Sequence, residues 1–328
     1  MSNILILTEI GEKIGFGHFS RCSSIAQELG KEYKVLVLLN QKGNSDYQIR
    51  SSNYKVKFFD WLNEDISFLK KDDFVIIDSY LAEQKHFNSL KKEGIKTLVL
   101  DDYYRLSYPT DYIINPNVSA DSSMYYSTSA KIFCGAEYVI LREEFRGISN
   151  VKQKENINEI VITVGGSDYR NLLPRFINKV IPLFPKFQFN ILAASEDYKT
   201  YLDSLNKNRN TEIFGFLHAE EIKNLFVKSD IAVSASGQTL GELVITSTPF
   251  VAFAVDDDQY PTQQFYLAQN IISEKILWSD SDFIEKIEIG IRNLLNKNER
   301  EIQIKKARKF IDGKGVERIV SNIKKVLL

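Results

Sequence analysis

Short apolar runs alternate along this chain with longer stretches in which apolar residues recur every three or four positions. The apolar runs lie at residues 4–7, 35–39, 74–77 and 97–100, and again at residues 159–164, 187–192, 212–214, 231–234 and 250–254. Such runs between helical patterns predict βαβ units and parallel sheets. Because the rhythm pauses and restarts, we expect an α/β protein of two doubly wound, Rossmann-like domains facing across a cleft.

A polar segment without periodicity separates the two halves at residues 147–158. Such a segment is typical of a linker, so we place an N-terminal domain at residues 1–150 and a C-terminal domain at residues 151–328. The length of 328 residues fits two cores better than one. After residue 277 the pattern is helical and charged, and Asp312-Gly313-Lys314-Gly315 interrupts it before a last helix.

The composition excludes several classes of partner. Lys and Arg number 42 against 43 Asp and Glu, so no broad basic surface is available for nucleic acid. No basic segment precedes the first apolar run, and no run approaches the roughly 20 residues that span a bilayer. We therefore expect a cytoplasmic protein without stable membrane insertion; the sequence does not determine the oligomeric state, for which a monomer is the working expectation.

Cysteine and histidine usage argues against metal chemistry. Cys22 and Cys134 are the two cysteines, which fits a reducing compartment and offers no disulfide framework. The three histidines are His18, His86 and His218. They lie far apart in the sequence and do not have the spacing of zinc ligands. We expect neither a metal nor another cofactor.

A glycine-rich loop, Gly15-Phe16-Gly17-His18, follows the first apolar run and precedes a helical pattern at residues 19–29. Glycines let backbone amides approach a ligand, and a helix start attracts negative charge. His18 at that position favours the neutral imidazole that a general base needs, and Arg21 is placed to bind an anion. The loop differs from the G-x-G-x-x-G pattern of dinucleotide sites. A tight turn with a helix-capping histidine stays open as an alternative.

A second glycine-rich turn begins the second half. Gly165, Gly166 and Ser167 follow an apolar run and precede a helix, which repeats the phosphate-binding pattern. A plain helix cap by Ser167 or Asp168 is the alternative.

A third strand-to-helix junction lies at residues 234–242. Its small residues Ser236, Gly237 and Thr239 suit a diphosphate, and Glu242 is placed to accept both hydroxyls of a ribose. A solvated glutamate in a first helical turn is the alternative.

Two further groups of polar residues follow apolar runs. Asp256, Asp257 and Asp258 alternate in direction in an extended chain and cannot all meet one ion, so Asp258 and Gln259 are better suited to sugar hydroxyls. Asp78-Ser79-Tyr80 follows the run at residues 74–77 and is expected to point to the same ligand, because ligands gather at strand carboxyl ends. An ordinary strand-to-helix turn is its alternative.

As a set, these motifs resemble the UDP-2,4-diacetamido-2,4,6-trideoxy-β-L-altropyranose hydrolases of pseudaminic acid synthesis. More distantly they resemble the lipid-linked glycosyltransferases of peptidoglycan assembly, which share a two-domain GT-B fold. The matching segments are residues 14–21 (IGFGHFSR), 76–80 (IIDSY), 134–145 (CGAEYVILREEF), 165–172 (GGSDYRNL) and residues 234–259. They occur in order and cover most of the chain.

The resemblance implies a role for each matching residue. It implies that His18 is the catalytic base and that Tyr80 lines the sugar pocket, that Gly166, Ser167 and Asn171 face the sugar diphosphate, and that Leu217 helps to hold uracil and Glu242 the ribose. Two positions depart from the family pattern, which usually has His at Ser79 and Asn at Asp258, so the identity of the hexose stays open.

The mechanism that this resemblance favours is inverting attack of water on the anomeric carbon, with UDP as the leaving group. Backbone amides of residues 166–168 and the small residues 236–239 are expected to meet the diphosphate charge, so the reaction needs no nucleophilic side chain. Two other functions stay open. One is a GT-B glycosyltransferase that uses a UDP-sugar donor and a lipid or glycan acceptor, and the other is a sugar-nucleotide-binding protein without catalysis.

Overall fold

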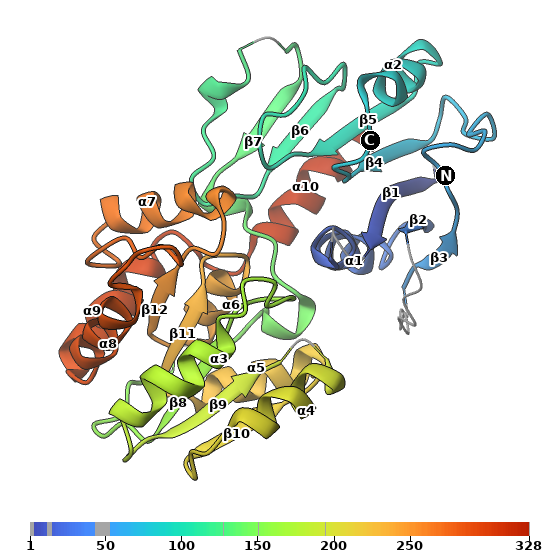
Figure 1. The fold of residues 1–328 in the computed structure, drawn as a ribbon. Coiled ribbons are helices and arrows are strands. Elements are labelled where there is room, and N and C mark those ends of the chain that lie inside the picture. Colours follow the sequence, from blue (N-terminus) through green and yellow to red (C-terminus); the bar gives the residue numbers. More distant parts are fainter. Residues whose placement is uncertain are drawn as a thin grey trace. The chain divides into compact units, whose positions relative to one another are not determined.

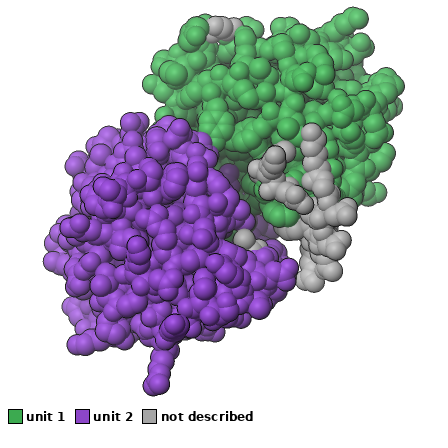
Figure 2. Space-filling model, in the orientation of Figure 1, with its two compact units in different colours: residues 1–142, 314–328 green, residues 143–313 purple. Residues whose placement is uncertain are grey.

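The computed structural model describes residues 3–11, 15–42, 53–126, 128–149, 151–193 and 195–327. Two compact units are present: unit 1 comprises residues 1–142 and 314–328, and unit 2 comprises residues 143–313 (Figure 2). This division differs from the boundary expected at residue 150, and it returns the last helix to the first unit. The reason is packing, because Val316 and Ile319 of α10 (Gly315–Leu327) join the same core as Ile25 of α1 (Gly17–Leu29).

The described part of unit 1 contains one parallel sheet of seven strands in the order β3-β2-β1-β4-β5-β6-β7 (Figure 1). The strands are β1 (Ile4–Gly11), β2 (Val35–Lys42), β3 (Lys55–Phe58), β4 (Phe74–Ile77), β5 (Lys96–Leu100), β6 (Tyr112–Asn115) and β7 (Lys131–Cys134). The four strands predicted in this half are confirmed, and β3, β6 and β7 are additional. Besides α1 and α10, the unit has α2 (Gln84–Lys92) and the 3-10 turns η1 (Ser122–Met124) and η2 (Ala136–Tyr138).

The apolar run of β1 is buried on both faces of this sheet. Ile4 and Ile6 pack into the core formed with α1 and α10, whereas Leu5 and Leu7 pack into the opposite core with Phe87 of α2. Successive side chains of a strand point to opposite faces, so a continuous apolar run is what a strand covered on both sides requires.

The described part of unit 2 contains a parallel sheet in the order β10-β9-β8-β11-β12. Its strands, all five of which were predicted, are β8 (Glu159–Thr163), β9 (Gln188–Leu192), β10 (Thr211–Phe214), β11 (Ile231–Ala235) and β12 (Phe250–Phe253). Its α-helices are α3 (Leu173–Arg175), α4 (Glu196–Leu205), α5 (Ala219–Lys228), α6 (Thr239–Thr246), α7 (Tyr260–Ala268), α8 (Phe283–Leu294) and α9 (Lys297–Ala307). Shorter turns are η3 (Glu143–Phe145), the π-helical η4 (Phe176–Val180), η5 (Ile181–Leu183) and η6 (Asp257–Gln259).

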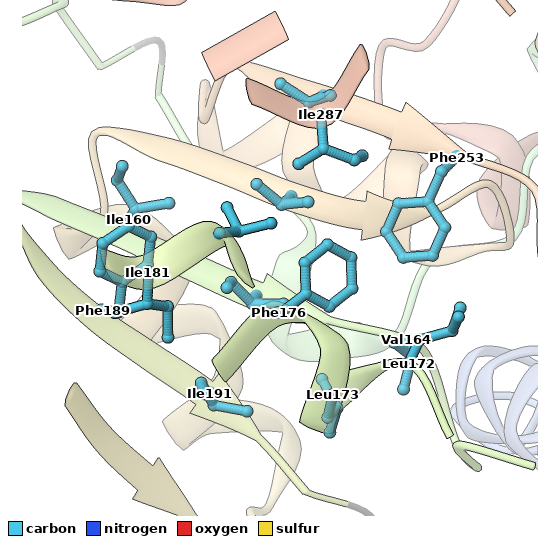
Figure 3. Close-up of a cluster of buried hydrophobic side chains, with 14 of the residues drawn as sticks. Ile160, Val164, Leu172, Leu173, Phe176, Ile181, Phe189, Ile191, Phe253 and Ile287 are labelled. Carbon is cyan, nitrogen blue, oxygen red and sulfur yellow. The ribbon is translucent and has the colours of Figure 1, made fainter. Parts of the chain in front are cut away.

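Phenylalanine rings pack among the aliphatic side chains of the core between this sheet and the helices α3 to η5 and α8. Figure 3 shows Phe176 of η4 facing Phe253 of β12, and their ring centroids lie 5.5 Å apart. Phe283 of α8 contacts both rings. This packing anchors the helical segment that follows the glycine-rich turn of unit 2.

Each sheet has one point at which the strand order reverses. In unit 1 it lies between β1 and β4, and in unit 2 it lies between β8 and β11. Open α/β sheets bind ligands outside the carboxyl ends of the strands at such switch points. The loops after these four strands contain most of the predicted site residues.

Candidate active site

In unit 1, the loop after β1 brings a histidine to the switch point. The amide of Gly15 donates to the Gly11 carbonyl at 2.7 Å, and Gly15 has a φ of +72°, which glycine adopts without strain. Helix α1 then starts at Gly17 with Phe16 as its N-cap residue, and no side chain caps it. The helix-capping alternative for His18 is therefore wrong. Ile14, the first residue of the matching motif, lies outside the described residues.

The side chain of His18 binds a buried carboxylate at the end of the neighbouring strand. Its Nδ1 lies 2.5 Å from Oδ1 of Asp78, the residue that follows β4. Arg21, one turn further along α1, donates to the same carboxylate through Nε at 2.5 Å and Nη2 at 2.6 Å. Three of the residues singled out from two separate motifs thus meet in one cluster.

These contacts decide which nitrogen of His18 carries the proton. An ionised Asp78 can only accept hydrogen bonds, so Nδ1 of His18 is the donor. Arg21 Nη2 lies 3.2 Å from Nδ1, which is farther than the 2.5 Å from Nδ1 to Asp78 and the 2.6 Å from Nη2 to Asp78. Within the described ranges, Nε2 of His18 makes no hydrogen bond. Its lone pair is therefore free to accept a proton, as in other His–carboxylate pairs.

The cluster is buried, and its charged side chains contact groups of opposite charge. Asp78 is 0% exposed, His18 4% and Arg21 5%. Burial alone would raise the pKa of Asp78, but the charge of Arg21 and the hydrogen bonds from Arg21 and His18 outweigh it and hold that pKa well below its usual range. Burial likewise opposes the charge of Arg21, yet Asp102 and Asp78 raise its pKa. Both groups stay charged at neutral pH.

Tyr80 completes the cluster from the loop after β4. Its ring stands at 90° to the His18 ring with centroids 4.1 Å apart, and its hydroxyl donates to Oδ2 of Asp102 at 2.7 Å. Burial and the Asp102 charge raise the pKa of Tyr80 above its usual range, so the phenol stays protonated. Tyr80 is therefore suited to contact a substrate and not to remove a proton from it.

A second buried carboxylate, Glu9, organises the same loop. Its Oε1 accepts from the Tyr80 amide at 2.7 Å and its Oε2 from the Ser79 hydroxyl at 2.5 Å. Ser79 Oγ in turn accepts from the amides of Leu81 and Ala82 at 3.0 and 2.9 Å. Ser79, which departs from the family pattern, thus has a structural role in this turn.

In unit 2, the glycine-rich turn after β8 is open and exposed. Gly165 has a φ of +90°, and a Cβ added at Gly165 or Gly166 would meet nothing within 4 Å. Ser167 and Asn171 are also exposed. Asp168 accepts from the amides of residues 172 and 173 at 2.7 and 2.8 Å, so its side chain binds the backbone at the start of α3, whose N-cap residue is Leu172.

The turn after β11 has a more closed structure. Ser236 is buried: its hydroxyl donates to the Phe253 carbonyl at 3.0 Å and accepts from Gln263 at 3.1 Å. Gln259 Oε1 accepts from the amides of Ser236 and Val255 at 3.1 and 3.2 Å. The structure therefore joins Ser236 to Gln259, and both side chains already have internal partners.

The remaining predicted residues lie on the same edges of the two sheets. Gly237 is exposed, Thr239 begins α6, and Glu242 in the first turn of α6 is 7% exposed. Asp258 is exposed in η6. Leu217 is half-buried in the loop after β10. The unit 2 switch point lies between β8 and β11, so Leu217 is on one side of it and Gln259, which follows β12, is on the other. Gly17 is exposed at the start of α1.

Sequence reasoning missed Asp102 and Glu9 and did not give Asp78 its role as the partner of His18. A signal for Asp102 was present, because Asp101 and Asp102 follow the apolar run of β5 in the way that Asp78 follows β4. No such signal exists for Glu9, which lies within β1. The sequence alone does not distinguish a buried glutamate at this position from an exposed one.

Two curated proteins are similar to the chain in sequence. It is 26% identical over 281 residues to an uncharacterized protein of Methanocaldococcus jannaschii. It is 23% identical over 291 residues, 87% of this chain, to a Helicobacter pylori protein named pseudaminic acid cytidylyltransferase and UDP-2,4-diacetamido-2,4,6-trideoxy-β-L-altropyranose hydrolase. The chain spans 58% and 50% of these relatives. No family model matches. The resemblance suspected from the motifs is confirmed at this level.

Solved structures identify the fold. MurG of Acinetobacter baumannii has a TM-score of 0.67 at 13% identity over 99% of this chain and 100% of that chain. Staphylococcus aureus MnaA, solved with UDP, has a TM-score of 0.64 at 13% identity over 100% and 97%. UGT2 of Phytolacca americana, complexed with UDP-2-fluoro-glucose and pterostilbene, has 0.66 at 10% identity over 100% of both chains. The chain has the GT-B fold, as expected. None of its described helices combines the length and apolarity needed to cross a membrane.

Proposed function

We propose that the chain hydrolyses a UDP-linked diacetamido-trideoxyhexose and releases UDP, as a step in the synthesis of a pseudaminic acid-like nonulosonate. The observation that carries this proposal is the 2.5 Å contact between His18 Nδ1 and Asp78, which leaves Nε2 as a proton acceptor at the switch point of unit 1. The hydrolase name of the Helicobacter pylori relative supports the choice of reaction and substrate.

In the proposed reaction, a water molecule attacks the anomeric carbon from the face opposite to the diphosphate. The new C–O bond forms as the bond from carbon to the phosphate oxygen breaks, and UDP leaves with the electron pair. The water proton passes to His18 Nε2. With Asp78 and Asp102 negative and Arg21 positive, this proton changes the summed formal charge of His18 and these three side chains from −1 to 0.

We assign the nucleotide to unit 2. Gly165, Gly166 and Ser167 are exposed, and we propose that the amides of Gly166 and Ser167 bind the diphosphate, because a glycine-rich turn before a helix lets backbone N–H groups approach a phosphate. Glu242 is proposed to bind the ribose hydroxyls and Leu217 the uracil. Asn171 and Asp258 are proposed to contact the sugar diphosphate and the sugar. Gly15, Gly17 and Tyr80 of unit 1 are proposed to line the sugar.

The test is UDP release by His18→Gln. Loss of the general base is expected to lower kcat by about 10²- to 10⁴-fold, while UDP affinity, measured by calorimetry, stays within about twofold. His86→Gln is the matched control, because His86 binds the Leu62 carbonyl and its ring contacts Trp61, neither of which contacts His18 or Asp78 in the described residues. Unchanged turnover in His18→Gln would contradict the assignment.

A glycosyltransferase is the second candidate, favoured by the likeness to UGT2, whose structure holds a sugar-nucleotide analogue together with pterostilbene. The two functions differ in the acceptor. UDP formed from the donor alone, as fast as with added lipid or glycan acceptor, supports the hydrolase; formation that requires an acceptor supports the transferase. Tight UDP binding without turnover in either assay would indicate a binding protein.

A further inference from the structure

Asp102, in the loop after β5, contacts two members of the His18 cluster at once. Its side chain is 6% exposed. Both carboxylate oxygens accept from Arg21 Nη1 at 2.7 Å, and Oδ2 also accepts from the Tyr80 hydroxyl at 2.7 Å. Asp102 therefore links the helix after β1 to the loop after β4.

The contacts form a closed circuit. His18 binds Asp78, Asp78 binds Arg21, Arg21 binds Asp102, Asp102 binds Tyr80, and the Tyr80 ring stands edge-on against His18. The members come from the loops and helix that follow β1, β4 and β5, which are neighbours in the sheet. Because each member has two neighbours in the circuit, loss of one link loosens both residues that it joined.

Asp102 determines the orientation of Arg21. The guanidinium presents one edge, Nε and Nη2, to Asp78 and its remaining nitrogen, Nη1, to Asp102. A planar group bound on two sides cannot rotate, so Asp78 in turn keeps a fixed position for the His18 Nδ1 proton. The same carboxylate holds the hydroxyl of Tyr80, a residue that is 39% exposed and whose ring also contacts Tyr103.

We propose that Asp102 is a positioning residue that orients His18 by two routes, through Arg21 and Asp78 and through Tyr80. The proposal rests on the proposed function only for its kinetic consequence, because the orientation of His18 can be measured without substrate.

The chain offers a matched control in the preceding residue. Asp101 is 4% exposed and accepts from the Tyr104 amide at 2.9 Å and from the hydroxyls of Tyr108 and Tyr125 at 2.8 and 2.6 Å. None of these donors belongs to the circuit. Asp101→Asn therefore changes a buried carboxylate of the same loop with equal chemistry but without a link to His18.

The test compares Asp102→Asn with Asp101→Asn in two measurements. The first is nitrogen-15 NMR of the imidazole side chains, which distinguishes the two neutral tautomers; the chain has three histidines, so the His18 signals are identified by their absence in His18→Gln. We expect wild type and Asp101→Asn to show His18 with its proton on Nδ1, and Asp102→Asn to show a mixture of tautomers. The second is the kinetics of UDP release, in which Asp102→Asn is expected to lower kcat by about 10- to 100-fold with KM changed little.

A double-mutant cycle with Tyr80→Phe tests the second route. Tyr80→Phe removes one link without changing any charge, and its effect on kcat is expected to shrink when Asp102 is already Asn. An unaltered His18 tautomer in Asp102→Asn, or equal losses of kcat in Asp101→Asn and Asp102→Asn, would overturn the proposal. The expected NMR change in a protein that releases no UDP would support the positioning role and contradict only the hydrolase.

Discussion

The carboxyl edges of the two sheets carry similar sequence motifs and have opposite construction. In unit 1, a glycine turn and helix bring His18 into a buried network in which charged side chains bind one another. In unit 2, the glycine turn after β8 leaves Gly165, Gly166 and Ser167 exposed, with open space around both glycines. The first edge is organised around side chains and the second around backbone.

This difference separates two tasks that one motif can serve. A proton acceptor needs a fixed tautomer and dry surroundings, which the Asp78 and Arg21 contacts provide. A diphosphate needs several N–H donors and close approach of the backbone, which glycines allow. The glycine loop at residues 15–18 is therefore better interpreted as the scaffold of a catalytic side chain than as a phosphate loop.

Asp78→Asn is expected to have the largest effect on the unit 1 edge. The amide can donate to His18 Nδ1 and so favour the wrong tautomer, and kcat is expected to fall by about 10³- to 10⁴-fold. Arg21 loses one of its two carboxylates, which is expected to cost about 3 kcal/mol of unfolding free energy. UDP binding, measured by calorimetry, is expected to be unaffected because the substitution does not touch unit 2.

Asp73→Asn is the control for Asp78→Asn. Asp73 precedes β4 as Asp78 follows it, is also buried, and accepts from Asn3 and the Lys70 amide. In Asp73→Asn the free energy of unfolding should fall while kcat is retained. A weaker UDP affinity in Asp78→Asn, or equal kcat in the two variants, would break the division of tasks between the edges.

Glu242→Gln is expected to have the next largest effect, on the unit 2 edge. If Glu242 accepts two ribose hydroxyls as proposed, its replacement should weaken UDP binding by about 10- to 100-fold, measured by calorimetry, and should raise KM more than it lowers kcat. Glu285→Gln, in the first turn of α8, is the control. If Glu242→Gln lowered kcat at constant KM, Glu242 would belong to the chemistry and not to the nucleotide.

The sheets were predictable because buried parallel strands appear as continuous apolar runs. The strands β8, β11 and β12 of unit 2 and β1, β2, β4 and β5 of unit 1 follow that rule most closely, whereas β9 and β10 include the polar residues Asn190 and Glu212. Of the additional strands, β3 has the weakest signal, because it is Lys55-Val56-Lys57-Phe58, with charged residues on an exposed edge. The place of α10 in unit 1 depends on contacts between chain ends, which local patterns do not encode.

The candidate site was predictable to the level of motifs but not of partners. His18, Arg21 and Tyr80 were named from the sequence, and the structure brings them together. Their link through Asp102 depends on the order β1-β4-β5 in the sheet, which no single motif specifies. Ser236 and Gln259 were expected to face the ligand, whereas their hydrogen bonds to Phe253 and to backbone amides depend on the register of β11 and β12.

Alanine at the two glycines of the turn after β8 is expected to have smaller, separable effects. Gly165→Ala places a side chain at a φ of +90° and should cost about 1 kcal/mol of stability or more. Gly166→Ala meets nothing within 4 Å and should leave stability unchanged, but its methyl group would keep a diphosphate from the backbone, at about 1 kcal/mol or a fivefold loss of UDP affinity. Unfolding is followed by Trp278 fluorescence in a Trp61→Phe background, and unchanged UDP binding in Gly166→Ala would contradict a backbone-lined diphosphate site.

The smallest expected effect concerns pH: the contribution of Asp78 to the free energy of unfolding should not change near neutral pH. Although burial opposes its charge, Asp78 has a pKa held below that of an unfolded aspartate, about 3.9, by Arg21 and His18. The unfolded chain therefore takes up the proton first on acidification, so this contribution to stability is complete above about pH 5 and is lost only as the pH falls below about 4. The comparison of His18→Gln with His18→Gln/Asp78→Asn removes the titration of the imidazole, and Trp61 fluorescence in a Trp278→Phe background follows unit 1. The difference in unfolding free energy should be constant from about pH 8 to 5 and shrink below that range. A difference that already declines near neutral pH would mean that Asp78 is not the stably ionised partner on which the unit 1 edge depends.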